Sequence, residues 1–192
     1  VLERAIRILS TLSDGTPRTL TELSEAIGVS SSTTFRLLAT LSFHNFVQRN
    51  EESGGYSLGL ACLELARTYL ASSDIRQEAL PELEKLRDET TETVHLAMID
   101  QDQMEVVYLE KLEGLEPIGP MHSRVGGRAP AYCTGVGKVL LAYADREAVE
   151  TFFARSGIVR HTPNTVATLE ELLQELDRIR QRGYAIDNAE HE

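Results

Sequence analysis

The sequence has no long apolar run, and this absence argues against a membrane protein. Its longest apolar stretches, such as residues 136–144, are interrupted within a few positions, whereas a transmembrane helix needs about 20 mostly apolar residues. A signal peptide is not recognisable either, because residues 2–12 form an amphipathic pattern with three charged side chains. We therefore expect no membrane partner and a cytoplasmic location.

Motifs for metal binding and catalysis are also missing. Cys62 and Cys133 form no metal-binding spacing, and reduced thiols are the simplest interpretation. The histidines show no paired ligand spacing, so no metal site is expected among His95, His122, His161 and His191. A phosphate-binding loop is excluded because Tyr132 and Val139 stand where glycine and Ser or Thr are required. With no nucleophile–base pair in sight, we expect neither an enzyme nor a cofactor.

The chain also has no excess of basic residues, because its net charge is −11. The charge is uneven: residues 1–59 hold five arginines and six acidic residues, and the other 133 residues hold 14 basic and 24 acidic ones. Residues 26–50 contain no acidic residue, where the chain average predicts about four. The overall acidity therefore does not exclude DNA binding by the N-terminal part.

The first 60 residues show the element order of a winged helix-turn-helix. Residues 1–13 predict a helix, and a second helix capped by Thr19 or Thr21 ends at Gly28. A third helix runs from Ser30 to about residue 42, and residues 46–58 read as a β-hairpin. On the first and third helices, the side chains expected to face the domain core are Leu2, Ile6, Leu9, Leu12, Phe35, Leu38 and Leu41.

In such a domain the third helix enters the major groove and the hairpin approaches the backbone or minor groove. The candidate contacts are hydroxyls at two helix starts, a cation on the third helix, and a cation and a phenol on the wing. They are Thr19, Thr21, Ser30, Ser31, Ser32, Thr33, Thr34, Arg36, Arg49 and Tyr56. The hydroxyl run is also typical of an ordinary capped helix start, and a winged helix can bind protein instead of DNA.

After residue 60 the pattern becomes a mixture of helices and strands. A helix over residues 60–72 is apolar on several sides and must bury more than one face, which predicts a partner chain. The remaining expected helices cover residues 75–90, 134–144, 145–156 and 168–182. Strands are expected at residues 93–99, 104–109, 117–122 and 184–186, with an Arg- and Gly-rich loop at residues 124–130.

A ligand site is predicted where Thr134 caps the helix that begins Gly135-Val136-Gly137. Small residues let a ligand approach the backbone N–H groups of the first turn, where the helix dipole favours an anion such as a carboxylate. Close packing of the helix through its glycines explains the same spacing equally well. Lys138 opposes the dipole, which hints at a partner elsewhere in the chain.

Several segments resemble the IclR family of bacterial transcriptional regulators. In the DNA-binding part they are residues 2–9, 23–29, 32–41 and 56–59, and further on they are residues 127–142 and 182–192. The resemblance implies an α+β protein of two domains: a winged helix-turn-helix over residues 1–59, a dimerisation helix over 60–74, and a GAF-like effector domain over 75–192. It also implies about fifty further residues beyond this chain. Expected partners are double-stranded operator DNA, a small organic acid, and identical copies in a homodimer or homotetramer.

The same resemblance implies which residues contact the effector, a sugar acid or an aromatic acid. They are Ile118, Met121, Gly135, Val136 and Asp187, to which the adjoining Cys133 and Thr134 are added. Cys133 is interpreted as a small buried hydrophobe rather than a nucleophile. Tyr132 stands where many relatives have histidine, and Gly135 where alanine is usual, so the pocket's shape is not inherited in detail. Two alternatives stay open: a protein-interaction module, and a ligand-processing enzyme with an appended winged helix.

Overall fold

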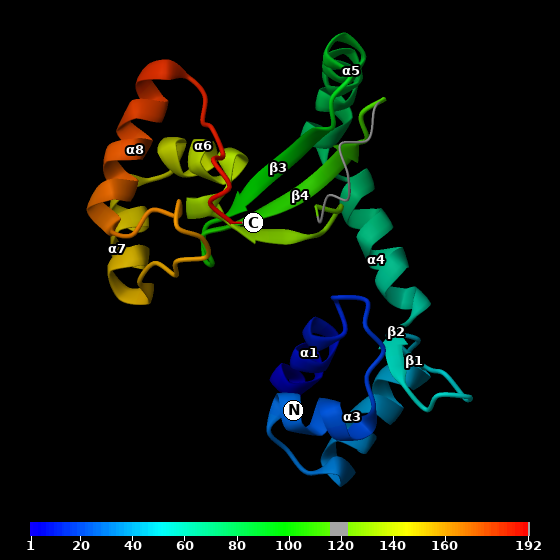
Figure 1. The fold of residues 1–192 in the computed structure, drawn as a ribbon. Coiled ribbons are helices and arrows are strands. Elements are labelled where there is room, and N and C mark those ends of the chain that lie inside the picture. Colours follow the sequence, from blue (N-terminus) through cyan, green and yellow to red (C-terminus); the bar gives the residue numbers. More distant parts are fainter. Residues whose placement is uncertain (116–122, 192) are drawn as a thin grey trace. The chain divides into compact units, whose positions relative to one another are not determined.

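A computed structural model describes residues 1–115 and 123–191 of the chain. It divides into two compact units, residues 1–73 and residues 74–192 (Figure 1). Among the described residues helices dominate both units, and each unit contains a small antiparallel sheet, so the expected α+β class is confirmed. None of the helices in the described segments combines the length and apolar character needed to cross a bilayer.

The first unit contains the predicted three helices and hairpin. Its elements are α1 (Leu2–Thr11), α2 (Leu20–Ile27), α3 (Ser31–Phe43), β1 (Val47–Arg49), β2 (Tyr56–Leu58) and α4 (Leu60–Ala71). Strands β1 and β2 pair antiparallel, with Val47 opposite Leu58. The hydrophobic core of the first unit is formed by Ile8, Leu12, Leu23, Ile27, Leu38, Val47 and Tyr56.

Local capping explains where α2 and α3 begin. Thr19, not Thr21, caps α2: its hydroxyl accepts the Glu22 N–H, and the Glu22 carboxylate accepts the Thr19 N–H at 2.7 Å, which completes a capping box. Gly28 ends α2 at φ 69°, a left-handed conformation that favours glycine. Ser30 caps α3 by accepting the Thr33 N–H.

The predicted core faces of α1 and α3 are partly wrong. Leu2 and Ile6 are exposed, whereas Leu12 is buried as predicted, together with Ile8, which lies one helical turn before it. The orientation of α1 is set by Arg7, whose guanidinium donates to the carbonyls of Ala26 and Ile27 at the end of α2.

On α3, Phe35 is 54% exposed, whereas Thr34 and Leu38, again one turn apart, face the core. Contacts of α3 with α1, α2 and β1 decide this orientation.

Helix α4 has no buried residue within the described chain. Its exposed large apolar side chains are Leu60, Leu63, Leu65 and Tyr69. Surface helices of a closed domain carry an apolar stripe on one side only and bury it. The apolar sides that the sequence predicts for this helix are thus left uncovered by the described residues.

In the second unit, helices pack around a sheet that has three strands among the described residues. Helix α5 (Asp74–Thr90), which contains Pro81, packs against β3 (Val94–Asp100) and β4 (Glu105–Leu112). The strand order is β3-β4-β5, all antiparallel. The third strand, β5 (Arg128–Pro130), lies at the end of the segment that was predicted as a loop, so the loop prediction is wrong for these three residues. The strand expected at residues 117–122 lies outside the described residues.

Arg128 explains why an Arg- and Gly-rich segment forms β5. Its guanidinium lies 2.8 Å from Asp100 and 2.9 Å from Glu105, at the turn that joins β3 to β4. This interaction and the main-chain pairing of residues 128–130 with β4 hold the segment against the sheet. The Arg128 guanidinium also lowers the pKa of the Asp100 carboxyl, mainly through its hydrogen bond.

A short 3₁₀ turn, η1 (Ala131–Cys133), leads from β5 into α6 (Gly135–Tyr143). Two more helices follow, α7 (Arg146–Ser156) and α8 (Leu169–Arg182). All three helices begin within one residue of the predicted starts, and Thr134, Asp145 and Thr168 cap them. Helix α6 packs against β3, β4 and α8 (Figure 1). The core here includes Val106, Ala131, Cys133, Leu141, Val149, Phe153, Leu172 and Ile179.

The predicted strand at residues 184–186 is wrong. These residues form an irregular segment that pairs with no strand of the described chain. Side chains hold it in place instead: Arg182 donates to the carbonyl of Tyr184 at 2.6 Å, and Lys138 donates to the carbonyl of Ile186 at 2.8 Å.

Candidate nucleic-acid interface and ligand site

The start of α3 presents the candidate DNA contacts that remain accessible. Ser31, Ser32 and Arg36 are exposed on α3, and Arg36 has no ion-pair partner among the described residues. Ser30 is also exposed, but its hydroxyl caps the helix and lies 3.1 Å from the hydroxyls of Ser32 and Thr33. Such a helix start offers backbone N–H groups, hydroxyls and a cation to a phosphate or a base edge.

Thr34 and Tyr56 do not fit the predicted interface. Thr34 is fully buried, and its hydroxyl donates to the carbonyl of Ser30 at 3.2 Å. Tyr56 is 5% exposed and packs in the core of the first unit, while its main chain pairs with Arg18. Both are structural residues, because a DNA contact needs an accessible polar group.

The wing and α2 contribute less. Arg49 is exposed, with its guanidinium 5.6 Å from the centre of the Tyr56 ring, so Tyr56 supports the cation rather than touching a ligand. Thr21 is exposed, and the Thr19 hydroxyl is occupied in the capping box with Glu22. The accessible set therefore centres on Ser31, Ser32, Arg36, Arg49 and Thr21.

The two glycines at the start of α6, Gly135 and Gly137, differ in the space around them, which the sequence could not reveal. A Cβ on Gly137 would lie 2.3 Å from the carbonyl oxygen of Ala131, so this glycine is required for close packing. A Cβ on Gly135 would meet the backbone nitrogen of Asp187 at 3.5 Å, an ordinary contact. The packing interpretation thus holds for Gly137, whereas Gly135 lies beside the segment that carries Asp187.

The other predicted effector residues surround this helix start unevenly. Thr134 is buried, and its hydroxyl accepts the Gly137 N–H. Val136 is half-buried against the core. Asp187 is exposed and accepts the Glu190 N–H at 3.1 Å. Ile118 and Met121 lie outside the described residues.

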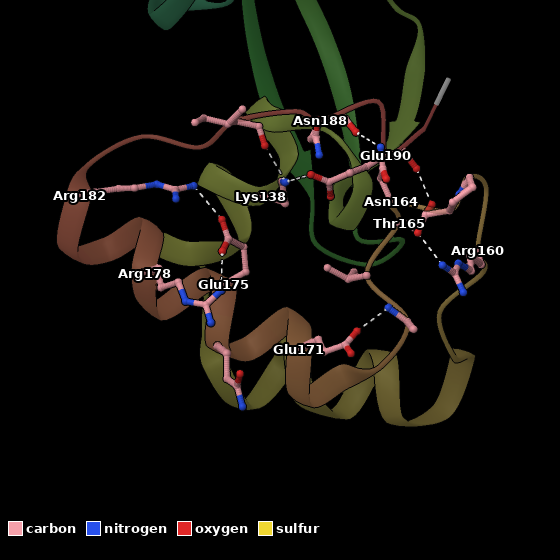
Figure 2. Close-up of a pocket in the computed structure, with 15 residues that line it drawn as sticks. Lys138, Arg160, Asn164, Thr165, Glu171, Glu175, Arg178, Arg182, Asn188 and Glu190 are labelled. Carbon is pink, nitrogen blue, oxygen red and sulfur yellow. Dashed lines mark hydrogen bonds and ion pairs between the residues drawn. The ribbon is translucent and has the colours of Figure 1, made fainter.

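Lys138 has the partner that its unfavourable place in the helix dipole suggested. Its ammonium pairs with Glu190 and donates to the carbonyl of Ile186 (Figure 2). The two charged side chains are 2% and 7% exposed, and the second carboxylate oxygen of Glu190 has no hydrogen-bond partner among the described residues. This pair ties α6 to the segment around residues 186–190.

Beside this pair lies a cavity of about 620 Å³, bounded by Lys138, Glu190, α8 and residues 160–167. Its rim carries both signs of charge, including Arg160, Glu175 and Arg182 (Figure 2). None of the predicted effector residues that the structure describes lines it. The cavity and the α6 start are therefore separate candidate sites.

Cys133 is surrounded by aromatic and titratable side chains that sequence spacing did not connect. The residue is fully buried, and burial is the main cause that raises the pKa of its thiol to about 12, as expected for an inert cysteine. The Tyr132 hydroxyl donates to the carbonyl of Val159 at 2.8 Å and lies 3.0 Å from Nε2 of His161. The rings of His161 and His191 are 4.9 Å apart.

Two family models match the chain. One describes the IclR helix-turn-helix domain and covers residues 1–51, and the other describes the C-terminal part of the bacterial transcriptional regulator IclR and covers residues 67–192. Between them they include α1 to α3 and the whole of the second unit.

Curated relatives agree with these matches. The HTH-type transcriptional regulator KdgR of Dickeya chrysanthemi is 38% identical over 185 residues, which is 96% of this chain and 60% of that protein. The HTH-type transcriptional regulator XynR of Escherichia coli (strain K12) is 37% identical over 193 residues, which is 100% of this chain and 75% of that protein. The chain thus spans between three fifths and three quarters of the length of these relatives.

Solved structures show the same fold. An IclR transcriptional regulator from Alicyclobacillus acidocaldarius superimposes with a TM-score of 0.84 at 31% identity, covering 99% of this chain and 76% of that one. An IclR homologue from Microbacterium hydrocarbonoxydans, solved with 4-hydroxybenzoate, gives 0.82 at 30% identity over 100% of this chain and 78% of that one. The relatives are regulators rather than enzymes, as expected, and this chain belongs to the IclR family of bacterial transcriptional regulators.

Proposed function

We propose that this protein binds operator DNA through α3 and the β1–β2 wing, and that a small organic acid bound in its second unit alters that affinity. The observation that carries the DNA-binding part is the exposed start of α3. Ser31, Ser32 and Arg36 project from a helix that lies in a stretch of sequence without acidic residues. A cation that has no ion-pair partner among the described residues, next to free helix N–H groups, matches the phosphate and base contacts of a recognition helix.

Three segments of the chain have different functions in this proposal, and the protein assembles into dimers or tetramers. Residues 1–59 bind DNA, residues 60–74 associate with a second copy, and residues 75–192 bind the effector. The exposed apolar side chains of α4 support the association, because an uncovered apolar helix is an unfavourable surface in water. Two recognition helices held at a set spacing would read a pseudo-palindromic operator. Such a regulator acts in the cytoplasm, where its operator is.

The effector is proposed to bind between the start of α6 and Asp187. Gly135 faces the segment that carries Asp187, and the first turn of α6 offers N–H groups to a carboxylate. A hydroxyl at the other end of the ligand can donate to the exposed Asp187 carboxylate. The relative solved with 4-hydroxybenzoate supports an organic acid as the ligand class, and both sugar acids and aromatic acids fit this chemistry.

Replacement of Arg36 by alanine tests the DNA-binding part. Fluorescence anisotropy with a duplex from the region upstream of the protein's own gene should show a loss of about 1–3 kcal/mol if Arg36 contacts a base. If Arg36 holds a phosphate, random duplexes should lose affinity equally, and the salt dependence should fall by about one ion. Arg155 is exposed on α7 in the other unit, so Arg155→Ala is the matched control for Arg36→Ala.

Two results would refute the proposal. Unchanged affinity of Arg36→Ala at low salt would remove this arginine from the interface. A wild-type protein that retains no duplex but captures a protein in a salt-insensitive manner would favour the alternative of a winged-helix interaction module.

Calorimetry tests the effector part with 4-hydroxybenzoate and gluconate as probes. Val136→Trp should block the site by volume while DNA binding is preserved. Asp187→Asn should weaken a hydroxylated acid by about 1–2 kcal/mol, because a charged acceptor becomes neutral. Equal affinity of wild type and both variants would place the site elsewhere, for instance in the cavity beside Lys138.

A further inference from the structure

We propose that Cys133, His161 and His191 form a binding site for a single divalent metal ion of the zinc class. The three residues come from η1, from the loop after α7 and from the segment after α8. They are far apart in sequence, and the fold brings one ligand atom of each to within 4.8 Å of the others. This site is independent of the proposed regulatory function and would exist whether or not an organic acid binds nearby.

The donor set and spacing suit zinc. Cysteine sulfur and histidine nitrogen bind Zn²⁺ at about 2.3 and 2.0–2.1 Å, so neighbouring ligands of a tetrahedral ion lie roughly 3.3–3.6 Å apart. Closing the cluster around an ion therefore requires movements on the order of 1 Å. The exposed side chain of His161 and the half-buried side chain of His191 can make them by rotation, while Cys133 stays fixed in the core.

The hydrogen bonds of Tyr132 prepare His161 as a ligand. The hydroxyl has one proton, which it donates to the carbonyl of Val159, so at its 3.0 Å contact with Nε2 of His161 it acts as the acceptor. The proton of the His161 ring is then on Nε2, and Nδ1 carries the lone pair. A metal-binding histidine whose second nitrogen donates to an oxygen is the usual arrangement around protein-bound metals.

The surrounding charges favour a cation at this place. The carboxylates of Asp187 and Glu190 disfavour the thiolate of Cys133, and the ammonium of Lys138, which pairs with Glu190, opposes them with a smaller effect. A divalent ion reverses that effect, because it is attracted by both carboxylates and stabilises the thiolate directly. On binding, the S–H bond of Cys133 breaks, a sulfur–metal bond forms, and the proton leaves to solvent.

Three protein ligands leave one tetrahedral position open, as in zinc sites that also bind water or a small ligand. The ion would join η1, the loop after α7 and the segment after Asp187 into one rigid cluster. These segments carry the start of α6 and the predicted effector residue Asp187. A bound metal would therefore stiffen the frame of that region without itself being the effector.

Cobalt(II) is the probe of choice, since it replaces zinc and its thiolate complex absorbs in the near ultraviolet. Tag-free full-length chain, stripped with a chelator, is titrated with CoCl₂ and then with ZnSO₄. We expect one equivalent of cobalt to produce a thiolate charge-transfer band, and zinc to displace it. Absence of this band in the wild type would overturn the proposal.

Matched variants locate the ligands. Cys133→Ser should abolish the charge-transfer band, whereas Cys62→Ser, which removes the other cysteine of the chain, should retain it. His161→Ala should weaken cobalt binding, and because His161 is exposed its loss does not endanger folding. Tyr132→Phe should weaken binding by about 10- to 100-fold through loss of the outer hydrogen bond. A band that persists in Cys133→Ser or is unaffected by His161→Ala would refute the assignment.

Discussion

Replacing Lys138 by methionine removes the positive charge of a buried ion pair while it keeps most of the side chain's volume. Glu190 then remains as a carboxylate that is 7% exposed, with one oxygen already lacking a hydrogen-bond partner within the described chain. The carbonyl of Ile186 also loses its donor at 2.8 Å. Leaving one member of a buried ion pair without its partner costs about 3–5 kcal/mol.

That cost is large beside the total stability of a domain, which is typically about 5–15 kcal/mol. For a unit of this size each kcal/mol lowers the melting temperature by roughly 3 °C, so Lys138→Met should lower that of the second unit by roughly 9–15 °C. Differential scanning calorimetry of the full chain measures it, and the transition of the first unit should not move, because α1 to α4 do not contain the pair.

Two comparisons make this test specific. Lys85→Met removes an exposed lysine that lies 4.0 Å from Glu89, with both side chains more than 60% exposed, and should cost less than about 1 kcal/mol. Lys138→Met combined with Glu190→Gln removes both buried charges and should recover most of the lost stability. The reasoning fails if Lys138→Met is no more destabilising than Lys85→Met, or if the double variant is less stable than the single one.

Three further outcomes are expected. Gly137→Ala should destabilise the second unit by about 1–3 kcal/mol in urea denaturation, because its Cβ meets the Ala131 carbonyl oxygen, whereas Gly135→Ala should be tolerated. Burial, and to a lesser extent the charge of Lys111, lower the pKa of His95, so near pH 6.5 the unfolded chain takes up a proton that the folded chain does not. The free energy of unfolding should therefore fall as the pH is lowered from about 7.5 to about 5.5. An equal dependence of this free energy on pH in His95→Gln would contradict the prediction. Leu63→Lys on α4 should give monomers in sedimentation experiments, whereas Glu64→Lys at the neighbouring exposed position should not. A wild-type protein that is monomeric at micromolar concentration would contradict association through α4.

Features encoded by neighbouring residues were predictable from the sequence. The caps Thr134, Asp145 and Thr168 act on N–H groups three residues further on, and Gly28 adopts a left-handed conformation that its own lack of a side chain permits. The IclR family itself was evident from segments that keep their order along the chain, and it implied both the winged helix and the ligand-binding unit.

Features that depend on what an element packs against were not predictable. Ile8 rather than Leu2 is buried on α1, and Thr34 rather than Phe35 on α3, because helices of similar periodicity can turn different faces to their neighbours. Residues 128–130 form a strand because β4 offers an edge to pair with, whereas residues 184–186 pair with none of the described strands.

The candidate sites show the same division most clearly. The sequence by itself marked the start of α6 and the anomaly of Lys138 in the first turn of a helix, since both are local properties. It could not identify Glu190, 52 residues away, as the partner of that lysine. Nor could it bring Cys133, His161 and His191 together. No spacing rule links residues on separate segments, because their proximity is created only when the chain folds around a common core.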